Sequence, residues 1–252
     1  MNKQNSWVLN RAGILDYWYY DEEYFDFADG RMLIRGQNGA GKSVTMQSFI
    51  PLLLDGKRNP ERLDPFNSKA RKLEDYLLGE YEVNGKEAGT GYLFLEFKRR
   101  HEEVYVSIGM GMRARKGQGI GGIWYFILTD GRRIGIDFFL YEKVLDGKVA
   151  LTRRKLENLI GDGGMVLDRQ EQYAAEVNKL LFGYDSLEEF EEMVDLIVKI
   201  RTPKLSRDLR PSHVYDIMQD SLPRLSEDDL RQLSESIENL DAIQTRLGSM
   251  KD

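Results

Sequence analysis

One glycine-rich segment constrains the fold more than any other part of the sequence. Residues 36–43 match the pattern G-x-x-x-x-G-K-[ST], and a chain of average composition and this length contains such a match by chance in about one case in a hundred. An apolar run at residues 32–35 precedes the segment, and a helical pattern at residues 44–54 follows it. The order of strand, glycine loop and helix therefore predicts a phosphate-binding P-loop.

Each residue type in the segment suits a nucleotide phosphate. Glycines let the backbone turn its N–H groups inward, and a helix that begins at Val44 directs its positive end at the same phosphate. Lys42 is the predicted catalytic residue because it can contact the β- and γ-phosphates, and the Ser43 hydroxyl is the predicted Mg²⁺ ligand. The sequence thus predicts ATP and Mg²⁺ as cofactors, bound by Gly36, Gln37, Asn38, Gly39, Ala40, Gly41, Lys42, Ser43 and Val44.

Composition limits the class of protein. A length of 252 residues suits one large domain or two small ones. The absence of cysteine excludes a disulfide framework and a thiolate zinc site, and it fits a reducing cytosol. No apolar run reaches ~18 residues and the first ten residues lack a signal-peptide core, so we expect a cytoplasmic protein without a membrane partner. A net charge of −6 means that any DNA contact must come from local basic patches.

The first 150 residues read mainly as strands. Three hairpins are expected: residues 24–36 about Asp29-Gly30, residues 89–115 about a charged turn at 100–102, and residues 120–142 about Asp130-Gly131. Residues 116–122 are rich in glycine and predict a flexible loop. With the loop–helix element at residues 36–54, this pattern predicts an α/β fold with a mixed β-sheet.

The remaining chain is predicted to be helical. Apolar residues recur at helical spacing in residues 152–161, 168–184 and 186–202, and a short helix is expected before Pro223. These helices complete a domain at residues 1–225. From Ser226, an N-cap, a seam then alternates at three and four positions, with Gln244 as its one polar member among Leu230, Leu233, Ile237, Leu240 and Leu247. Residues 226–252 therefore predict either the root of a coiled coil or an amphipathic helix that packs on the domain.

The parts needed for ATP hydrolysis are missing. A Walker B strand needs an Asp for the metal and usually a Glu for the attacking water, after four apolar residues. Glu96 follows an apolar run but has no Asp beside it, and Asp130 stands alone in an expected turn. No Ser-Gly-Gly signature occurs either. We therefore expect the chain to bind ATP and the second half of the site to lie in another segment, beyond a coiled coil.

The combination of "IRGQNGAGKS" with a preceding aromatic two-strand segment resembles the N-terminal half of the ABC-type ATPase head in the SMC and MukB-like superfamily. More narrowly, several stretches resemble the MukB-like motor subunit of bacterial Wadjet systems, often called JetC. The similarity covers most of residues 6–240, and these stretches carry it: "NRAGILDYWYYDEEYFDFADGRMLIRGQNGAGKSVTMQSFIPLLLDG", "LEDYLLGEY", "FILTDGRRIGIDFFLY", "LLFGYDSLEEFEEMVDLIVKIRTPKLSRDL" and "SLPRLSEDDL".

The resemblance implies an architecture and a set of partners. In this superfamily the Walker A half is followed by a long antiparallel coiled coil, and Walker B and the signature return at the C-terminus. Wadjet is a condensin-like defence complex against plasmids, in which ATP drives DNA translocation or loop extrusion and a partner nuclease cuts the trapped circle. The implied partners are the C-terminal half of the same head, a second head in a homodimer, kleisin and winged-helix subunits, double-stranded DNA and that nuclease. The resemblance therefore also implies a cytoplasmic protein associated with the nucleoid.

The resemblance also implies, by position in the chain, three further nucleotide-binding residues. Asn10 and Arg11 stand where related heads place polar groups near the nucleotide phosphates, with an ordinary surface turn as the alternative. Arg71 stands where SMC heads carry an arginine close to ATP and DNA, with Arg58 and Arg62 as rivals. The region that supplies a Q-loop glutamine in ABC heads, residues 196–206, contains no Gln, which is a departure from the family.

Other readings of the sequence stay open. A self-contained kinase or GTPase would need its own Walker B or catalytic acid, and a GTPase would need an N/T-K-x-D motif, which is absent. A nucleotide-binding module that never hydrolyses is the third possibility. Tyr19 and Tyr20 can stack on adenine or pack at an edge of the core. The basic clusters are either solvated faces or DNA-phosphate contacts, and they lie at residues 69–72, 99–100, 113–116, 132–133 and 153–155.

Overall fold

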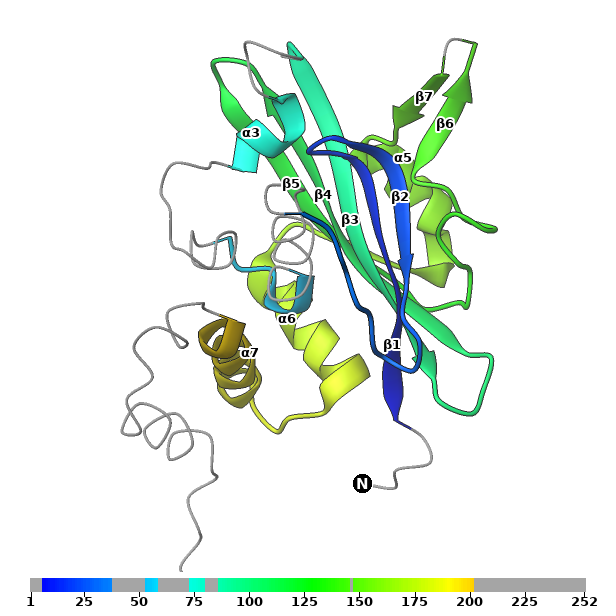
Figure 1. Cartoon of the computed structure of the whole chain (residues 1–252), viewed down its shortest axis with the longest axis vertical. Coiled ribbons are helices and arrows are strands. Elements are labelled where there is room, and N and C mark those ends of the chain that lie inside the picture. The colour runs from blue at the N-terminus through cyan, green and yellow to red at the C-terminus, as the bar shows by residue number, and fades with distance from the viewer. Residues whose placement is uncertain (1–5, 38–52, 59–72, 80–85, 146, 202–252) are drawn as a thin grey trace, which may run out of the picture. The chain divides into compact units, whose positions relative to one another are not determined.

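The computed structural model describes residues 6–37, 53–58, 73–79, 86–145 and 147–201 (Figure 1). All of them belong to the first of two units into which the chain divides, Met1–Arg207 and Asp208–Asp252. The short helix predicted before Pro223 and the heptads of residues 226–252 lie outside the described residues.

A six-stranded sheet organises the described residues. Every pairing between its strands is antiparallel, so the mixed sheet that the sequence predicted is not found in this part of the chain. Two further strands form a separate antiparallel hairpin, β6 (Tyr141–Val144) and β7 (Gly147–Ala150). In spatial order the sheet comprises β2 (Tyr20–Asp26), β1 (Trp7–Tyr17), β3 (Ala88–Arg99), β4 (Tyr105–Arg115), β5 (Gly119–Leu128) and β8 (Gly164–Leu167).

The three helices predicted at residues 152–161, 168–184 and 186–202 are confirmed in the described residues. Thr152 caps the first of them, because its hydroxyl accepts a hydrogen bond from the Lys155 N–H at 3.4 Å. A π-helical segment, Asn178–Phe182, extends the second, and Gly183 ends it with φ of 74°. The helices are α3 (Leu73–Leu78), α5 (Arg153–Ile160), α6 (Gln170–Val177) and α7 (Leu187–Arg201).

The sheet is covered on both faces, as Figure 1 shows. Along β3, Leu93 and Leu95 point to one face and Tyr92 and Phe94 to the other, because successive side chains of a strand alternate. The first face packs against α3, α6, α7 and a helical turn at residues 53–55. The second packs against α5 and the loop at residues 129–140. The chain therefore combines α and β structure in three layers, with a core on each side of the sheet.

Two predicted hairpins differ from the structure, while the one between β3 and β4 is confirmed. Asp29 and Gly30 do form a tight turn, with φ of 50° and 75°, closed by a bridge between Ala28 and Arg31. The chain after Arg31 forms no further ladder, so the strand predicted at residues 32–35 is not regular strand in the structure.

After β5, Asp130 and Gly131 turn the chain, but the next residues form a loop instead of a returning strand. The carboxylate of Asp130 holds Arg132, whose guanidinium donates to the Leu159 and Ile160 carbonyls at the end of α5, at 2.9 and 2.8 Å. The strand that pairs with β5 on the side away from β4 is instead β8, which lies between two helices and was not predicted as a strand.

The glycine-rich residues 116–122 are a tight turn and the start of β5, where the sequence had predicted a flexible loop.

Candidate functional site

The structure describes the two ends of the predicted P-loop element. Gly36 and Gln37 are exposed at its start, which agrees with a Gln37 side chain that faces solvent. The remaining predicted nucleotide ligands lie outside the described residues, so their roles stay predictions: Asn38, Gly39, Ala40, Gly41, Lys42, Ser43, Val44 and Arg71.

The segment that enters the loop is extended and alternates in burial. Met32 and Ile34 are half-buried, whereas Leu33 is 74% exposed and Arg35 is exposed. Among the described residues no strand pairs with residues 32–35. This segment therefore has the alternation of a strand without a ladder partner in the described part of the chain.

A helical turn is described at residues 53–55, where the sequence predicted the end of the helix that leaves the loop. Residues 53–55 are helical, and Leu53, Leu54 and Asp55 are buried against the first face of the sheet. Gly56 follows with φ of 71°, the left-handed conformation that commonly ends a helix. The Asp55 carboxylate accepts a hydrogen bond from the Lys57 N–H at 2.9 Å, which fixes the turn beyond the helix.

Three side chains bind the carbonyls at this helix end, and we call them the carbonyl clamp: Tyr125, Gln170 and Tyr173. The Tyr173 hydroxyl donates to the Leu53 carbonyl at 2.5 Å, and the Gln170 amide donates to the Asp55 carbonyl at 2.6 Å. The Tyr125 hydroxyl donates to the Gly56 carbonyl at 2.9 Å. Because the last carbonyls of a helix have no partner within it, the clamp supplies the donors that they need.

The two tyrosines of the clamp form one unit. Their rings stack with centroids 4.7 Å apart and an interplanar angle of 23°. Burial raises the pKa of both hydroxyls, of Tyr173 well above its ordinary value, so both remain protonated donors at neutral pH. The clamp thus joins β5 and α6 to the end of the helix that leaves the predicted P-loop.

An ion pair extends this connection to α7. The Lys57 ammonium lies 2.7 Å from the Glu191 carboxylate, and both side chains are about a quarter exposed. Beside the clamp lies a hollow of about 250 Å³, lined by Arg58, Tyr125, Asp168, Gln170 and residues 120–123. Arg58, one of the two rivals to Arg71, is therefore an exposed cation next to the clamp.

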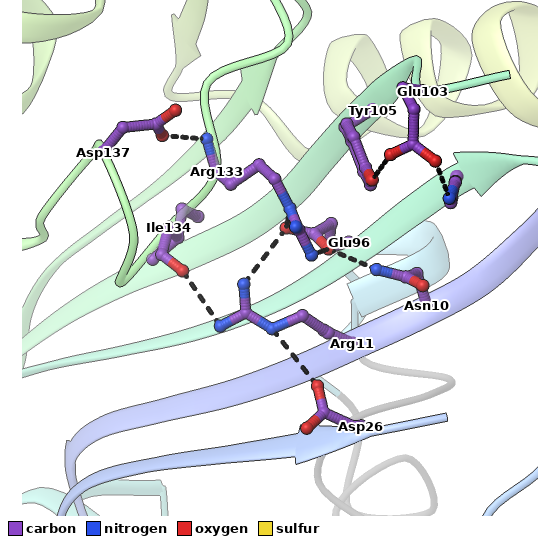
Figure 2. Close-up of polar contacts among 10 residues, drawn as sticks. Asn10, Arg11, Asp26, Glu96, Glu103, Tyr105, Arg133, Ile134 and Asp137 are labelled. Carbon is purple, nitrogen blue, oxygen red and sulfur yellow. Dashed lines mark hydrogen bonds and ion pairs between the residues drawn. The ribbon is translucent and has the colours of Figure 1, made fainter. Parts of the chain in front are cut away.

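Asn10 and Arg11 lie within β1 on the opposite face of the sheet, where both contact Glu96 (Figure 2). Leu9 pairs with Phe97 and Arg11 pairs with Glu96, so Asn10 is the extra residue of a β-bulge. The bulge turns two consecutive side chains toward one carboxylate. The Asn10 amide donates to Glu96 at 2.6 Å, and the Arg11 guanidinium lies 3.4 Å from it. Neither residue lies in a surface turn.

A second arginine completes the neutralisation of Glu96, which is fully buried. The Arg133 guanidinium donates to both carboxylate oxygens, at 2.8 and 3.2 Å, and lies 4.2 Å from the centre of the Tyr105 ring. The hydrogen bonds to Glu96 raise the pKa of Arg133. Arg11 also donates to the Ile134 carbonyl at 3.1 Å, so this cluster fastens the loop at residues 129–140 to the sheet (Figure 2).

The two carboxylates considered as Walker B candidates, Glu96 and Asp130, are therefore both paired with arginine side chains. Glu96 is surrounded by cationic and amide donors, on the face of the sheet that does not carry residues 53–55. Asp130 binds the backbone and side chain of Arg132 in its turn. Within the described ranges, no group of three or more His, Cys, Asp or Glu side chains is arranged to hold a metal ion.

Sequence reasoning missed the carbonyl clamp. Gln170 begins α6, and no motif of the sequence assigned it a partner at residues 53–56. One sequence feature did point to such a site: Gly56 follows an apolar helical pattern. A glycine there predicts the end of a helix, where the last backbone carbonyls need hydrogen-bond donors from elsewhere. Of the aromatic residues weighed for adenine, Tyr20 packs edge-on against Phe25 at 6.2 Å, whereas Tyr19 is 57% exposed.

Comparison with known proteins adds no identification. A scan of the chain against protein-family models found no matching family, and a search of curated proteins found no match either. In the part of the chain that the structure covers, no helix has both the length and the apolar character needed to cross a membrane.

Proposed function

We propose that this chain is the ATP-binding N-terminal portion of an SMC-like motor head, in which residues 36–44 bind the phosphates and Mg²⁺. The sequence pattern G-x-x-x-x-G-K-S carries the proposal. The described ends of the element support it, because the helical turn at residues 53–55 is anchored by three side chains while the segment in front of the loop is extended. A fixed helix behind a glycine loop is the arrangement that phosphate binding requires.

Hydrolysis would need a second polypeptide segment. Glu96 and Asp130 are both engaged by arginines, so neither is offered to a metal at the loop. Leu33 is largely exposed in a segment with strand-like alternation and no ladder partner among the described residues. A strand that pairs beside residues 32–35 would cover Leu33 and bring a Walker B carboxylate next to the loop. We propose that the C-terminal half of the same head supplies this strand.

The biological setting follows from the resemblance to Wadjet motor subunits. The proposed motor dimerises, binds kleisin and winged-helix subunits, and couples ATP binding and hydrolysis to translocation of double-stranded DNA in defence against plasmids.

The test of this proposal is ATP turnover in three samples: the chain alone, the chain mixed with a C-terminal head fragment of a Wadjet-type motor, and the same mixture with Lys42→Ala. Turnover only in the unsubstituted mixture supports the split head. Turnover by the chain alone contradicts it and favours a kinase or GTPase. ATP binding without turnover in any sample favours a module that does not hydrolyse.

A further inference from the structure

We propose that Tyr173, Gln170 and Glu191 are positioning residues that couple nucleotide binding at the P-loop to the placement of α6 and α7. This inference rests on the proposed function, because it assigns a regulatory connection to the same site. It uses only the described end of the helix, where the carbonyl clamp and the Lys57–Glu191 ion pair meet.

The connection is direct, because the contacts join the helix end to two elements, α6 and α7. Tyr173 and Gln170 belong to α6 and bind the Leu53 and Asp55 carbonyls. Glu191 belongs to α7 and pairs with Lys57. Leu53 follows Ser43, the predicted metal ligand, by only ten positions in the chain. A shift of the loop that accompanies phosphate binding would therefore pull on α6 and α7 through bonded contacts.

The two helices are also packed as one layer on the first face of the sheet. Tyr173, Ala174 and Val177 of α6 share a core with Phe190 and Val194 of α7, and all five are fully buried. Close-packed cores resist gradual deformation, so the layer is expected to move as a body when its contacts with residues 53–57 change. α7 ends at Arg201 and the chain continues toward the segment whose heptads predict a coiled coil.

The chain offers a matched control for the loss of a buried tyrosine hydroxyl. Tyr92 is fully buried, and its hydroxyl donates to the Leu151 carbonyl at 2.6 Å. That bond lies on the second face of the sheet, away from residues 53–57. Tyr92→Phe and Tyr173→Phe therefore remove the same group from equally buried sites, and only the second removes a bond to the helix that leaves the loop.

The experiment measures ATP·Mg²⁺ affinity of the full chain by calorimetry for the wild type, Tyr173→Phe and Tyr92→Phe, with thermal unfolding as a check on folding. We expect Tyr173→Phe to weaken ATP binding by about tenfold, in the range typical of coupling between sites, and Tyr92→Phe to leave it unchanged. Gln170→Met, at a half-buried position, tests the same connection if Tyr173→Phe is poorly folded.

A second measurement tests whether ATP binding at the loop affects α7. Hydrogen exchange of α7 backbone amides should slow when ATP binds to the wild type, and Glu191→Gln should reduce that change without unfolding α7. Equal ATP affinities for the two Phe variants, or α7 exchange that ATP leaves unchanged, would overturn the coupling. A wild-type chain that binds no ATP would overturn the proposed function as well.

Discussion

The guanidinium of Arg11 lies 3.4 Å from the buried carboxylate of Glu96, although 85 positions separate the two residues in the chain. A bulge at Asn10 makes this contact possible, because it places Asn10 and Arg11 on the same face of β1. Sequence position had suggested a role for both residues at the nucleotide phosphates. In the structure their side chains bind Glu96, and a role at the phosphates stays a prediction.

Removal of the Glu96 carboxylate should destabilise the protein strongly. Glu96→Leu leaves Arg11 buried without its main counter-charge, and loss of one partner from a buried ion pair typically costs about 3–5 kcal/mol. Urea unfolding measures the change in the free energy of unfolding. The double variant Arg11→Met/Glu96→Leu should recover part of the loss, since it removes the stranded charge.

Asp26 provides the control for this prediction. Its carboxylate lies 3.5 Å from Arg11, but the side chain is 88% exposed, so water screens the pair. Asp26→Asn should change the free energy of unfolding by no more than about 0.5 kcal/mol. If Glu96→Leu is as mild as Asp26→Asn, the cluster does not fasten the loop at residues 129–140 to the sheet.

Gly56 should tolerate a side chain much less well than Gly117. The two glycines have nearly the same backbone conformation, with φ of 71° and 73°. A Cβ on Gly56 would lie 2.8 Å from the Tyr125 ring and 3.1 Å from the Tyr173 ring, whereas a Cβ on Gly117 meets nothing within 4 Å. Alanine at either position carries the backbone cost of about 1 kcal/mol, and at Gly56 crowding adds about 1–3 kcal/mol.

Thermal and urea unfolding of Gly56→Ala and Gly117→Ala separate these two costs. The difference between the variants reports the crowding of the stacked tyrosines, because the backbone cost is common to both. Equal stabilities would mean that the tyrosine pair moves aside without loss, and that the carbonyl clamp is not a rigid contact.

The contact between Glu22 and Lys148 should make stability depend on acid pH. Burial acts to raise the pKa of Glu22, but hydrogen bonds from Lys148 and Tyr24 lower it below its ordinary value of 4.5. A lowered pKa gives stability that is fully present above the ordinary value and is lost as the pH falls through the folded-state value. Glu22→Gln should therefore destabilise the protein at neutral pH by at most about 1 kcal/mol and have less effect in acid.

Urea unfolding of the wild type and Glu22→Gln at about pH 7 and about pH 3 tests this dependence. A difference in the free energy of unfolding that is the same at both pH values would show that the carboxylate is not held by Lys148. Since Glu22 lies on β2 and Lys148 on β7, the same measurement reports how firmly the β6–β7 hairpin is joined to the sheet.

Local patterns in the sequence predicted the elements whose stability is local. Two apolar runs about a charged turn located β3 and β4, and apolar residues at helical spacing located α5. The Asp29-Gly30 turn was also predictable, because positive φ at both positions suits those residues.

Long-range pairing was not predictable from the same patterns. Residues 164–167 form a strand because they pair with the free edge of β5, a contact between segments far apart in the chain. Residues 32–35 have the sequence pattern of a strand but no ladder partner in the described part of the chain. The contacts to Glu96 depend on the β-bulge at Asn10, and no glycine or other turn residue in the sequence predicts that bulge. In the carbonyl clamp, Tyr173 binds Leu53 although 120 positions separate them in the chain. At that separation no periodic pattern of the sequence predicts a contact.

The proposed phosphate-binding loop is tested most directly by ATP·Mg²⁺ binding to the full chain. Calorimetry measures the affinity of the wild type and of Lys42→Ala, and circular dichroism checks that both are folded. We expect saturable binding to the wild type and its loss in a folded Lys42→Ala, because Lys42 is the charge that meets the β- and γ-phosphates. Equal affinity in the two proteins, or no binding by a folded wild type, would contradict a phosphate-binding loop at residues 36–43.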